Sequence, residues 1–113
     1  MAFETLNELS RLETDYVYVP VLARDVLSGA LTNPTGDTVA MTFTIGERLP
    51  DAPTWYQADW ITDEDGKFWA RCLVGPDGGE LALAASPTWW PTVKIGDNPT
   101  TPMIRAARPF RVR

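Results

Sequence analysis

The chain has 113 residues, of which 44% are hydrophobic, and a formal net charge of -5. This length suits one domain, and an acidic chain is a poor general binder of nucleic acid, since such binders present a basic face. Histidine is absent and cysteine occurs once, so the chain alone cannot form a catalytic Ser-His-Asp triad, a zinc site of several Cys or His or an internal disulfide. We therefore expect no catalytic residues, no metal site and no cofactor.

The charges are distributed unevenly along the sequence. The last nine residues hold no acid and four arginines, Arg105, Arg108, Arg111 and Arg113. They carry +4, so the rest of the chain carries -9. Seven acids lie between Asp51 and Glu80, against one lysine and one arginine. A basic C-terminal strand or tail and an acidic middle favour head-to-tail association or docking on an acidic partner; the alternative is that both are ordinary solvated faces.

Residues 1–13 predict an N-terminal arm. Leu6, Leu9 and Leu12 recur at every third position, but the segment is too short to form a stable helix alone. It lacks the basic start and apolar centre of a secretory signal, and no run in the chain approaches the length needed to cross a bilayer. We expect the arm either to pad the domain formed by residues 14–113 or to reach onto a neighbouring subunit.

Two-residue alternation dominates the first half of that domain. From Asp15 to Ala23, three valines point one way and two tyrosines the other, as in a strand with one buried face. After turn residues 33–37, the strand Thr38–Ile45 places four apolar side chains on one face, namely Val39, Met41, Phe43 and Ile45. A third strand is predicted at Trp55–Ile61, with Tyr56, Ala58 and Trp60 on a shared side.

Turn residues then alternate with short strands. Residues 63–66 predict a hairpin turn into a strand at 67–74, and residues 75–79 predict a second turn into a short strand at 80–84. Asp63 also stands where an EF-hand calcium loop would begin, but position 12 of that loop is Val74 instead of Glu. The turn is therefore the preferred interpretation. Cys72 lies in an apolar run and is expected to be a buried structural thiol.

A strand at Trp89–Ile95 and a closing segment at Pro102–Val112 complete the pattern. Pro91 removes a ladder donor, which leaves two alternatives: a bulge at Pro91, or a strand that begins at Thr92. About seven strands separated by turn signals are typical of a sandwich. The predicted fold class is all-β, a single immunoglobulin-like antiparallel β-sandwich with a short N-terminal arm.

The aromatic residues are numerous for so small a domain. Trp89 and Trp90 are consecutive and must point to opposite faces of a strand, so some tryptophans face outward. Outward aromatic residues can anchor a protein interface. The candidate contact residues are leucines of the arm, tryptophans of the sheets and the C-terminal arginines: Leu6, Leu9, Trp55, Trp69, Trp90, Arg105, Arg108, Arg111 and Arg113.

Four motifs, in their order, resemble small virion proteins of tailed bacteriophages of actinobacteria. Residues 33–43 resemble their D-P-T-G-D-x-V-x-F-x-F opening, and residues 58–60 their A-x-W strand. Residues 70–76 resemble their A-x-x-L-V-G-P strand and turn, and residues 93–102 their V-x-V-K-I-x-D-N-P-E-x-P run. Asn33 and Thr100 replace the Asp and Glu of that pattern. Trp89 takes the place of a Tyr in a tyrosine-corner-like arrangement, where we expect it neither to accept nor to donate as the phenol would.

The resemblance implies a non-enzymatic sandwich assembled into the particle, at a head-to-tail connector, capsid-associated or tail position. The implied partners are other virion proteins and copies of the chain itself, reached through edge strands and terminal arms. The implied location is the virion, after synthesis in the host cytoplasm. No membrane, nucleic acid or small-molecule substrate is expected as a partner. The alternative function is a carbohydrate- or host-surface-binding module that uses Trp55, Trp60 or Trp69 as a stacking platform.

Overall fold

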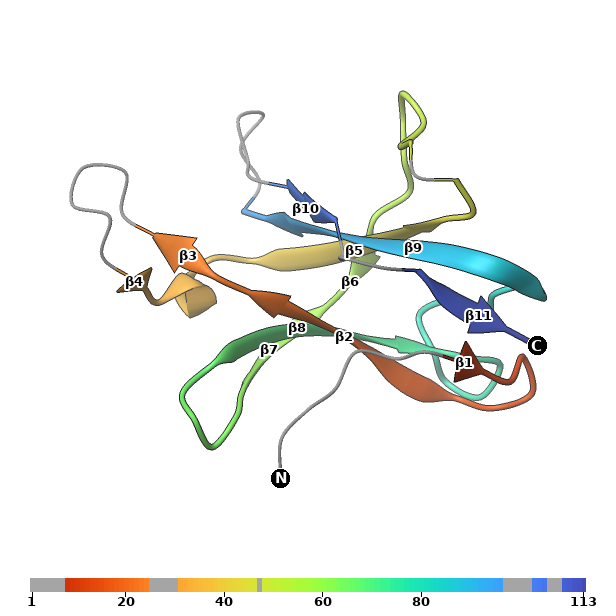
Figure 1. The fold of residues 1–113 in the computed structure, drawn as a ribbon, viewed down its shortest axis with the longest axis horizontal. Coiled ribbons are helices and arrows are strands. Elements are labelled where there is room, and N and C mark those ends of the chain that lie inside the picture. The colour runs from red at the N-terminus through yellow and green to blue at the C-terminus, as the bar shows by residue number, and fades with distance from the viewer. Residues whose placement is uncertain (1–7, 25–30, 47, 97–102, 106–108) are drawn as a thin grey trace.

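The computed structural model describes residues 8–24, 31–46, 48–96, 103–105 and 109–113 (Figure 1). These residues form an all-β protein with one short 3-10 helix, η1 (Pro34–Gly36), and no helix in them could span a membrane. The strands are β1 (Glu8–Leu9), β2 (Asp15–Val21), β3 (Ala23–Arg24), β4 (Leu31–Thr32), β5 (Val39–Thr44), β6 (Tyr56–Gln57), β7 (Asp59–Thr62), β8 (Phe68–Val74), β9 (Ser86–Ile95), β10 (Met103–Arg105) and β11 (Phe110–Val112).

Two sheets pack face to face to make the body of the protein (Figure 1). The larger sheet has the order β1-β11-β9-β5-β6, with β10 also paired to β9, and the smaller sheet has the order β2-β8-β7. All described pairings in them are antiparallel except that of β1 with β11. Strands β3 and β4 form a separate two-stranded hairpin. The sandwich prediction is confirmed, and the finer immunoglobulin-like assignment stays a prediction.

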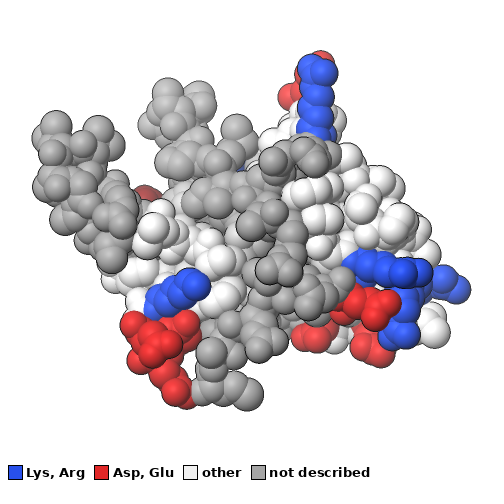
Figure 2. Space-filling view, in the orientation of Figure 1, with Lys and Arg blue, Asp and Glu red and all other residues white. Residues whose placement is uncertain are grey.

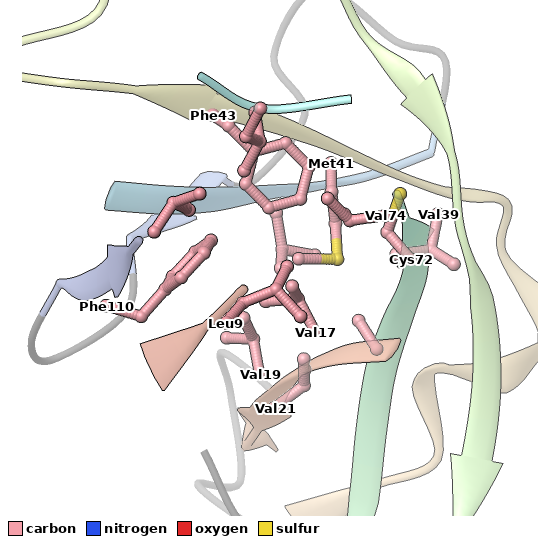
Figure 3. Close-up of a cluster of buried hydrophobic side chains, with 14 of the residues drawn as sticks. Leu9, Val17, Val19, Val21, Val39, Met41, Phe43, Cys72, Val74 and Phe110 are labelled. Carbon is pink, nitrogen blue, oxygen red and sulfur yellow. The ribbon is translucent and has the colours of Figure 1, made fainter. Parts of the chain in front are cut away.

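The core lies between the inner faces of the two sheets (Figure 3). The predicted alternation holds in β2, where Val17, Val19 and Val21 are buried, and in β5, where Met41 is fully buried. Aromatic rings close one side of the core, where Phe43 of β5 meets Phe110 of β11 edge to face at 6.2 Å. Such inward, alternating apolar residues are what a two-sheet core requires.

Two expectations about strand ends were wrong. Ile45 lies beyond the end of β5 and is 54% exposed, so it does not continue the buried face. The predicted strand at residues 80–84 is reduced to an isolated parallel bridge between Leu81 and Val74. Gly75 shapes the turn before it, since its φ is +143° and a Cβ there would lie 2.4 Å from the Cα of Thr14. The chain therefore leaves β8 in a loop and not in a hairpin.

The predicted strand Trp55–Ile61 is divided between the two sheets. Residues of β6 pair with β5 in the larger sheet, and residues of β7 pair with β8 in the smaller one. The break falls at Ala58, whose N–H donates to the carbonyl of Val39 at 3.3 Å. Tyr56, Ala58 and Trp60 all pack against the core from this segment, as the sequence predicts.

Strand β9 runs through Pro91, so neither alternative for this residue is correct. Pro91 pairs with Phe43 on one side. On the other side, the described pairings place β10 opposite residues 92–94 and β11 opposite Trp89 and Ser86. Pro91 thus lies between the ends of two partner strands, where a missing N–H costs no described ladder bond. The register between β9 and β11 shifts between the pairs Phe110–Trp89 and Val112–Ser86, where β9 has one residue more than β11, so the irregularity lies before Pro91 and not at it.

Trp89 and Asn33, at which the chain departs from the pattern it resembles, both make local hydrogen bonds. The indole N–H of Trp89 donates to the carbonyl of Ala84, five residues upstream, at 2.9 Å. A tyrosine corner makes the same kind of contact with its hydroxyl, so the expectation that Trp89 cannot donate in this way was wrong. Asn33 accepts a hydrogen bond from the N–H of Thr35 at 2.9 Å, as an Asp would in a turn.

Part of the N-terminal arm belongs to the larger sheet. Strand β1 pairs with β11 through Leu9 and Val112, and the Arg113 N–H donates to the Leu9 carbonyl at 2.9 Å. The side chain of Leu9 is 4% exposed and joins the core. Residues 8 and 9 therefore pad the sandwich, which was one of the two alternatives for the arm; residues 1–7 lie outside the described part of the chain.

Candidate protein-binding face

The outer face of the smaller sheet brings together residue types that are typical of protein interfaces. Because the valines of β2 and Ala70, Cys72 and Val74 of β8 point into the core, the alternate residues of these strands point outward. We call this surface the tyrosine–arginine face and define it by five residues, Tyr16, Tyr18, Asp59, Trp69 and Arg71. The strand register places them within three adjacent strands.

Arg71 is held in place from two sides. Its guanidinium carbon lies 4.3 Å from the centre of the Tyr16 ring, and its Nε donates to Oδ2 of Asp59 at 3.0 Å. The ring comes from β2 and the carboxylate from β7, so the central strand β8 presents its arginine between two neighbours. The side chain of Arg71 is 25% exposed. This arrangement orders a flexible cation before any partner binds.

Trp69 forms the second part of the face. Its ring meets Tyr18 edge to face at 6.5 Å, and the Nζ of Lys67 lies 4.8 Å from its ring centre. Its indole N–H donates to Oδ2 of Asp63 at 3.0 Å. The side chain is only 5% exposed. Trp69 was predicted as a contact residue, and the structure corrects this: its neighbours cover it, so it supports the face instead of contacting a partner.

Asp63 organises the hairpin turn between β7 and β8. Its Oδ1 accepts hydrogen bonds from the backbone N–H groups of Asp65 and Lys67, both at 2.9 Å, and Gly66 closes the turn with a φ of +78°. The hydrogen bond from the Trp69 indole is the main cause that lowers the pKa of Asp63, and the two backbone bonds lower it further. Oδ1 is thus used by the turn and Oδ2 by the Trp69 indole, and the predicted turn at residues 63–66 is confirmed.

The candidate tryptophans on the larger sheet occupy a different environment. Trp55 and Trp90 are half-buried, and the Nζ of Lys94 lies 4.8 Å from the centre of the Trp55 ring. Between them on the same outer face, Thr42 and Thr92 pair across β5 and β9 and are each 3% exposed. Trp55 and Trp90 thus keep some accessible surface, as a contact residue requires.

The predicted contact residues near the two termini have different locations. Leu9 is buried in the core from strand β1, which pairs with β11, so the structure corrects its assignment as a contact residue: its side chain cannot reach a partner. Leu6 and Arg108 lie outside the described residues, and Arg105 is described only as part of the β10 backbone.

The basic C-terminal strip is mixed with acids. Arg111 and Arg113 are exposed, and Nε of Arg113 lies 3.3 Å from Oε1 of Glu8. Figure 2 shows basic side chains gathered over the β1–β11 end of the molecule with acidic ones among them, whereas acidic side chains gather at the β7–β8 turn. The ion pair within the chain reduces the charge that Arg113 offers to a partner.

The remaining side chains with potential chemistry are the Cys72 thiol and the possible metal ligands. Cys72 is buried, and that burial, followed by the charges of Glu80 and Asp59, raises its thiol pKa to about 12. The thiol is therefore protonated near neutral pH and is a poor nucleophile. In the described ranges no group of three or more His, Cys, Asp or Glu is placed to hold a metal ion.

A shallow depression lies beside the end of β5. Phe43, Leu49 and Trp89 line its apolar part, and Arg48 and Asp51 supply its charges. Its volume is about 580 Å³. It opens widely to solvent, so it lacks the walls that enclose a small ligand.

Several residues of the tyrosine–arginine face were not predicted as contact residues. The sequence shows that Tyr16 and Tyr18 share one side of a strand, but it does not show that Arg71 and Asp59 lie beside them. The signal is present only when β2, β8 and β7 are placed in register. The face is thus a product of strand pairing, built by segments up to 55 residues apart in the chain. No protein-family model, curated protein or solved structure matches the chain.

Proposed function

We propose that this protein is a non-enzymatic structural component of a tailed bacteriophage particle that binds neighbouring virion proteins, copies of itself included, through the tyrosine–arginine face. The observation that carries the proposal is Arg71, held between the Tyr16 ring and the Asp59 carboxylate on a partly exposed sheet face. The bacteriophage particle in this proposal comes from the ordered motifs that resemble small virion proteins. A connector, capsid-associated or tail position in that particle fits equally well.

The residue types on this face favour a protein partner. Tyr, Trp and Arg are enriched among the few residues that dominate binding energy in protein interfaces. Ordering a long side chain on binding costs about 0.5–1.5 kcal/mol, and Arg71 is already ordered by its two neighbours. A partner that covers the face would also exclude water from the Asp59–Arg71 pair. This strengthens the attraction between the two charges but adds a desolvation cost.

The terminal arms have a smaller role in this proposal than the sequence suggests. Leu9 is committed to the core and Arg113 is paired with Glu8. Arg111 is exposed on β11 and remains a candidate contact. We therefore place the principal contact on the smaller sheet and treat the β1–β11 end as a secondary one.

A carbohydrate-binding function is less well supported by the geometry. Trp60 packs against the core and donates its indole N–H to the Asp37 carbonyl at 2.9 Å, and Trp69 is 5% exposed. Of the three proposed stacking platforms, Trp55 keeps the most favourable position, and Lys94 lies over its ring. Saturable quenching of tryptophan fluorescence by a sugar, lost in Trp55→Ala, would favour this alternative.

The proposal is tested by the double variant Tyr16→Ala/Arg71→Ala, supplied in place of the unchanged chain during particle assembly. Loss of one interface hot spot weakens binding by about 2 kcal/mol or more, roughly 30-fold. We expect the variant to be folded and strongly depleted from purified particles, as quantified by gel densitometry. Arg48→Ala, an exposed arginine beside the shallow depression, is the matched control and should be incorporated normally. Normal incorporation of the double variant would contradict the proposal.

A further inference from the structure

Among the described strands, β2 is the longest at an edge of either sheet. It has seven residues and pairs on one side with β8, in the order β2-β8-β7. An edge strand of this length offers a row of backbone groups to which another chain can add a strand, which leads to aggregation or to β-augmentation. Whether β2 can accept a strand depends on the backbone groups that face its open side.

The backbone direction of β8 can be determined from two hydrogen bonds. Asp63 donates to the carbonyl of Lys67 at 3.0 Å, and Glu80 donates to the carbonyl of Leu73 at 2.8 Å. Odd-numbered residues of β8 therefore direct their backbone groups away from β2, and even-numbered residues direct theirs toward it, since these directions alternate along a strand.

The register of β2 with β8 then assigns the two sides of β2. Val17 pairs with Cys72 and Val19 with Ala70, so the valines use their backbone groups on β8. The alternate residues Tyr16, Tyr18 and Pro20 direct theirs toward the open side of the sheet.

Two of these three positions offer no donor to an incoming strand. The N–H of Tyr16 donates to Oδ1 of Asp15 at 2.7 Å, and Pro20 has no N–H at all. Proline and charged side chains on edge strands are among the devices by which proteins prevent edge-to-edge pairing.

We infer that Asp15 and Pro20 close the edge of β2 to strand addition, so that a neighbour reaches this strand only through its side chains. The inference is independent of the proposed function, because it concerns backbone groups and not the tyrosine–arginine face. It also identifies the sheet edge at which copies of this chain do not join.

The double variant Asp15→Ala/Pro20→Val tests the inference. It restores a donor at position 20 and frees the Tyr16 N–H, while valine suits a strand. We expect association to begin at a protein concentration about ten-fold lower than for the unchanged chain, with increased thioflavin T fluorescence and the infrared signature of intermolecular β-sheet. A ten-fold shift corresponds to ~1.4 kcal/mol.

The matched control is Asp51→Ala/Pro50→Val, which changes the same residue types in an exposed loop and should behave like the unchanged chain. Association of the control to the same degree would overturn the inference, as would a folded test variant that associates no more than the unchanged chain. If Pro20→Val does not fold, Asp15→Ala and Asp15→Asn decide alone. Asparagine keeps an oxygen acceptor for Tyr16, so equal association of these two would also overturn the inference.

Discussion

The outer faces of the two sheets carry similar residues in different surroundings. On the smaller sheet Trp69 has a ring contact, a cation contact and a hydrogen-bonded indole, and it is 5% exposed. On the larger sheet Trp55 is half-buried, with Lys94 over its ring. The comparison shows that the role of an outward tryptophan is decided by its cross-strand neighbours and not by its residue type.

The first prediction compares the two tryptophans directly. Trp69→Ala should lower the free energy of unfolding by about 3–5 kcal/mol, the usual cost of removing a buried large aromatic side chain. Trp55→Ala should cost about 1 kcal/mol or less, because a half-buried ring with one exposed cation contact contributes little more than that. Urea denaturation of both variants measures the difference. Equal losses would show that the two faces are energetically alike.

The second prediction concerns the hydrogen bonds that hold the Asp63 turn. Their effect is to lower the folded-state pKa of Asp63 below its usual value, so the folded protein binds this proton less readily than the unfolded chain does. The resulting stability is present above the unfolded pKa of about 4 and is lost as the pH falls through the folded pKa.

Asp63→Asn removes this titration and serves as the control. The unchanged chain should be more stable than Asp63→Asn at pH 7, and the difference should shrink as the pH is lowered below about 4. Thermal unfolding at several pH values measures it. A difference that stays constant down to pH 2 would contradict the assigned role of the Trp69 indole and the turn N–H groups.

The third and smallest effect is expected at the Asp59–Arg71 pair. The two side chains are 56% and 25% exposed, and exposed ion pairs contribute about 0.2–1 kcal/mol. A double-mutant cycle with Asp59→Ala and Arg71→Ala should therefore give a coupling free energy in this range. A coupling well above it would place the pair in a more buried environment. Within the smaller sheet we therefore expect Trp69 to contribute more to stability than the Asp59–Arg71 pair does.

The strands with clean alternation were predicted well from the sequence. The inward valines of β2, the inward Val39, Met41 and Phe43 of β5, and the turn at residues 63–66 all lie where the pattern places them. In each case a local signal determines the result, because side-chain direction in a strand alternates with a period of two and glycine permits the turn.

Other elements could not be predicted because their partners are distant in the chain. The sequence from Trp55 to Ile61 reads as one strand, yet its two halves pair with different sheets. Pro91 is tolerated within β9 because β10 and β11 divide the opposite edge between them. Leu9 and Trp69 look like exposed contact residues until β1 is paired with β11, which directs Leu9 into the core, and Tyr18 is placed against Trp69.

The sequence by itself determined that this chain is all-β, which residues of β2 and most of those of β5 are buried, and where the turn at residues 63–66 lies. The tertiary structure alone decided which outward residues meet. Strand register brings Tyr16, Arg71 and Asp59 together. It also determines that the backbone groups of Tyr16 and Pro20 face the edge of β2 that lies away from β8. The physical reason is that alternation depends on neighbouring residues, whereas register depends on the packing of segments far apart in the chain.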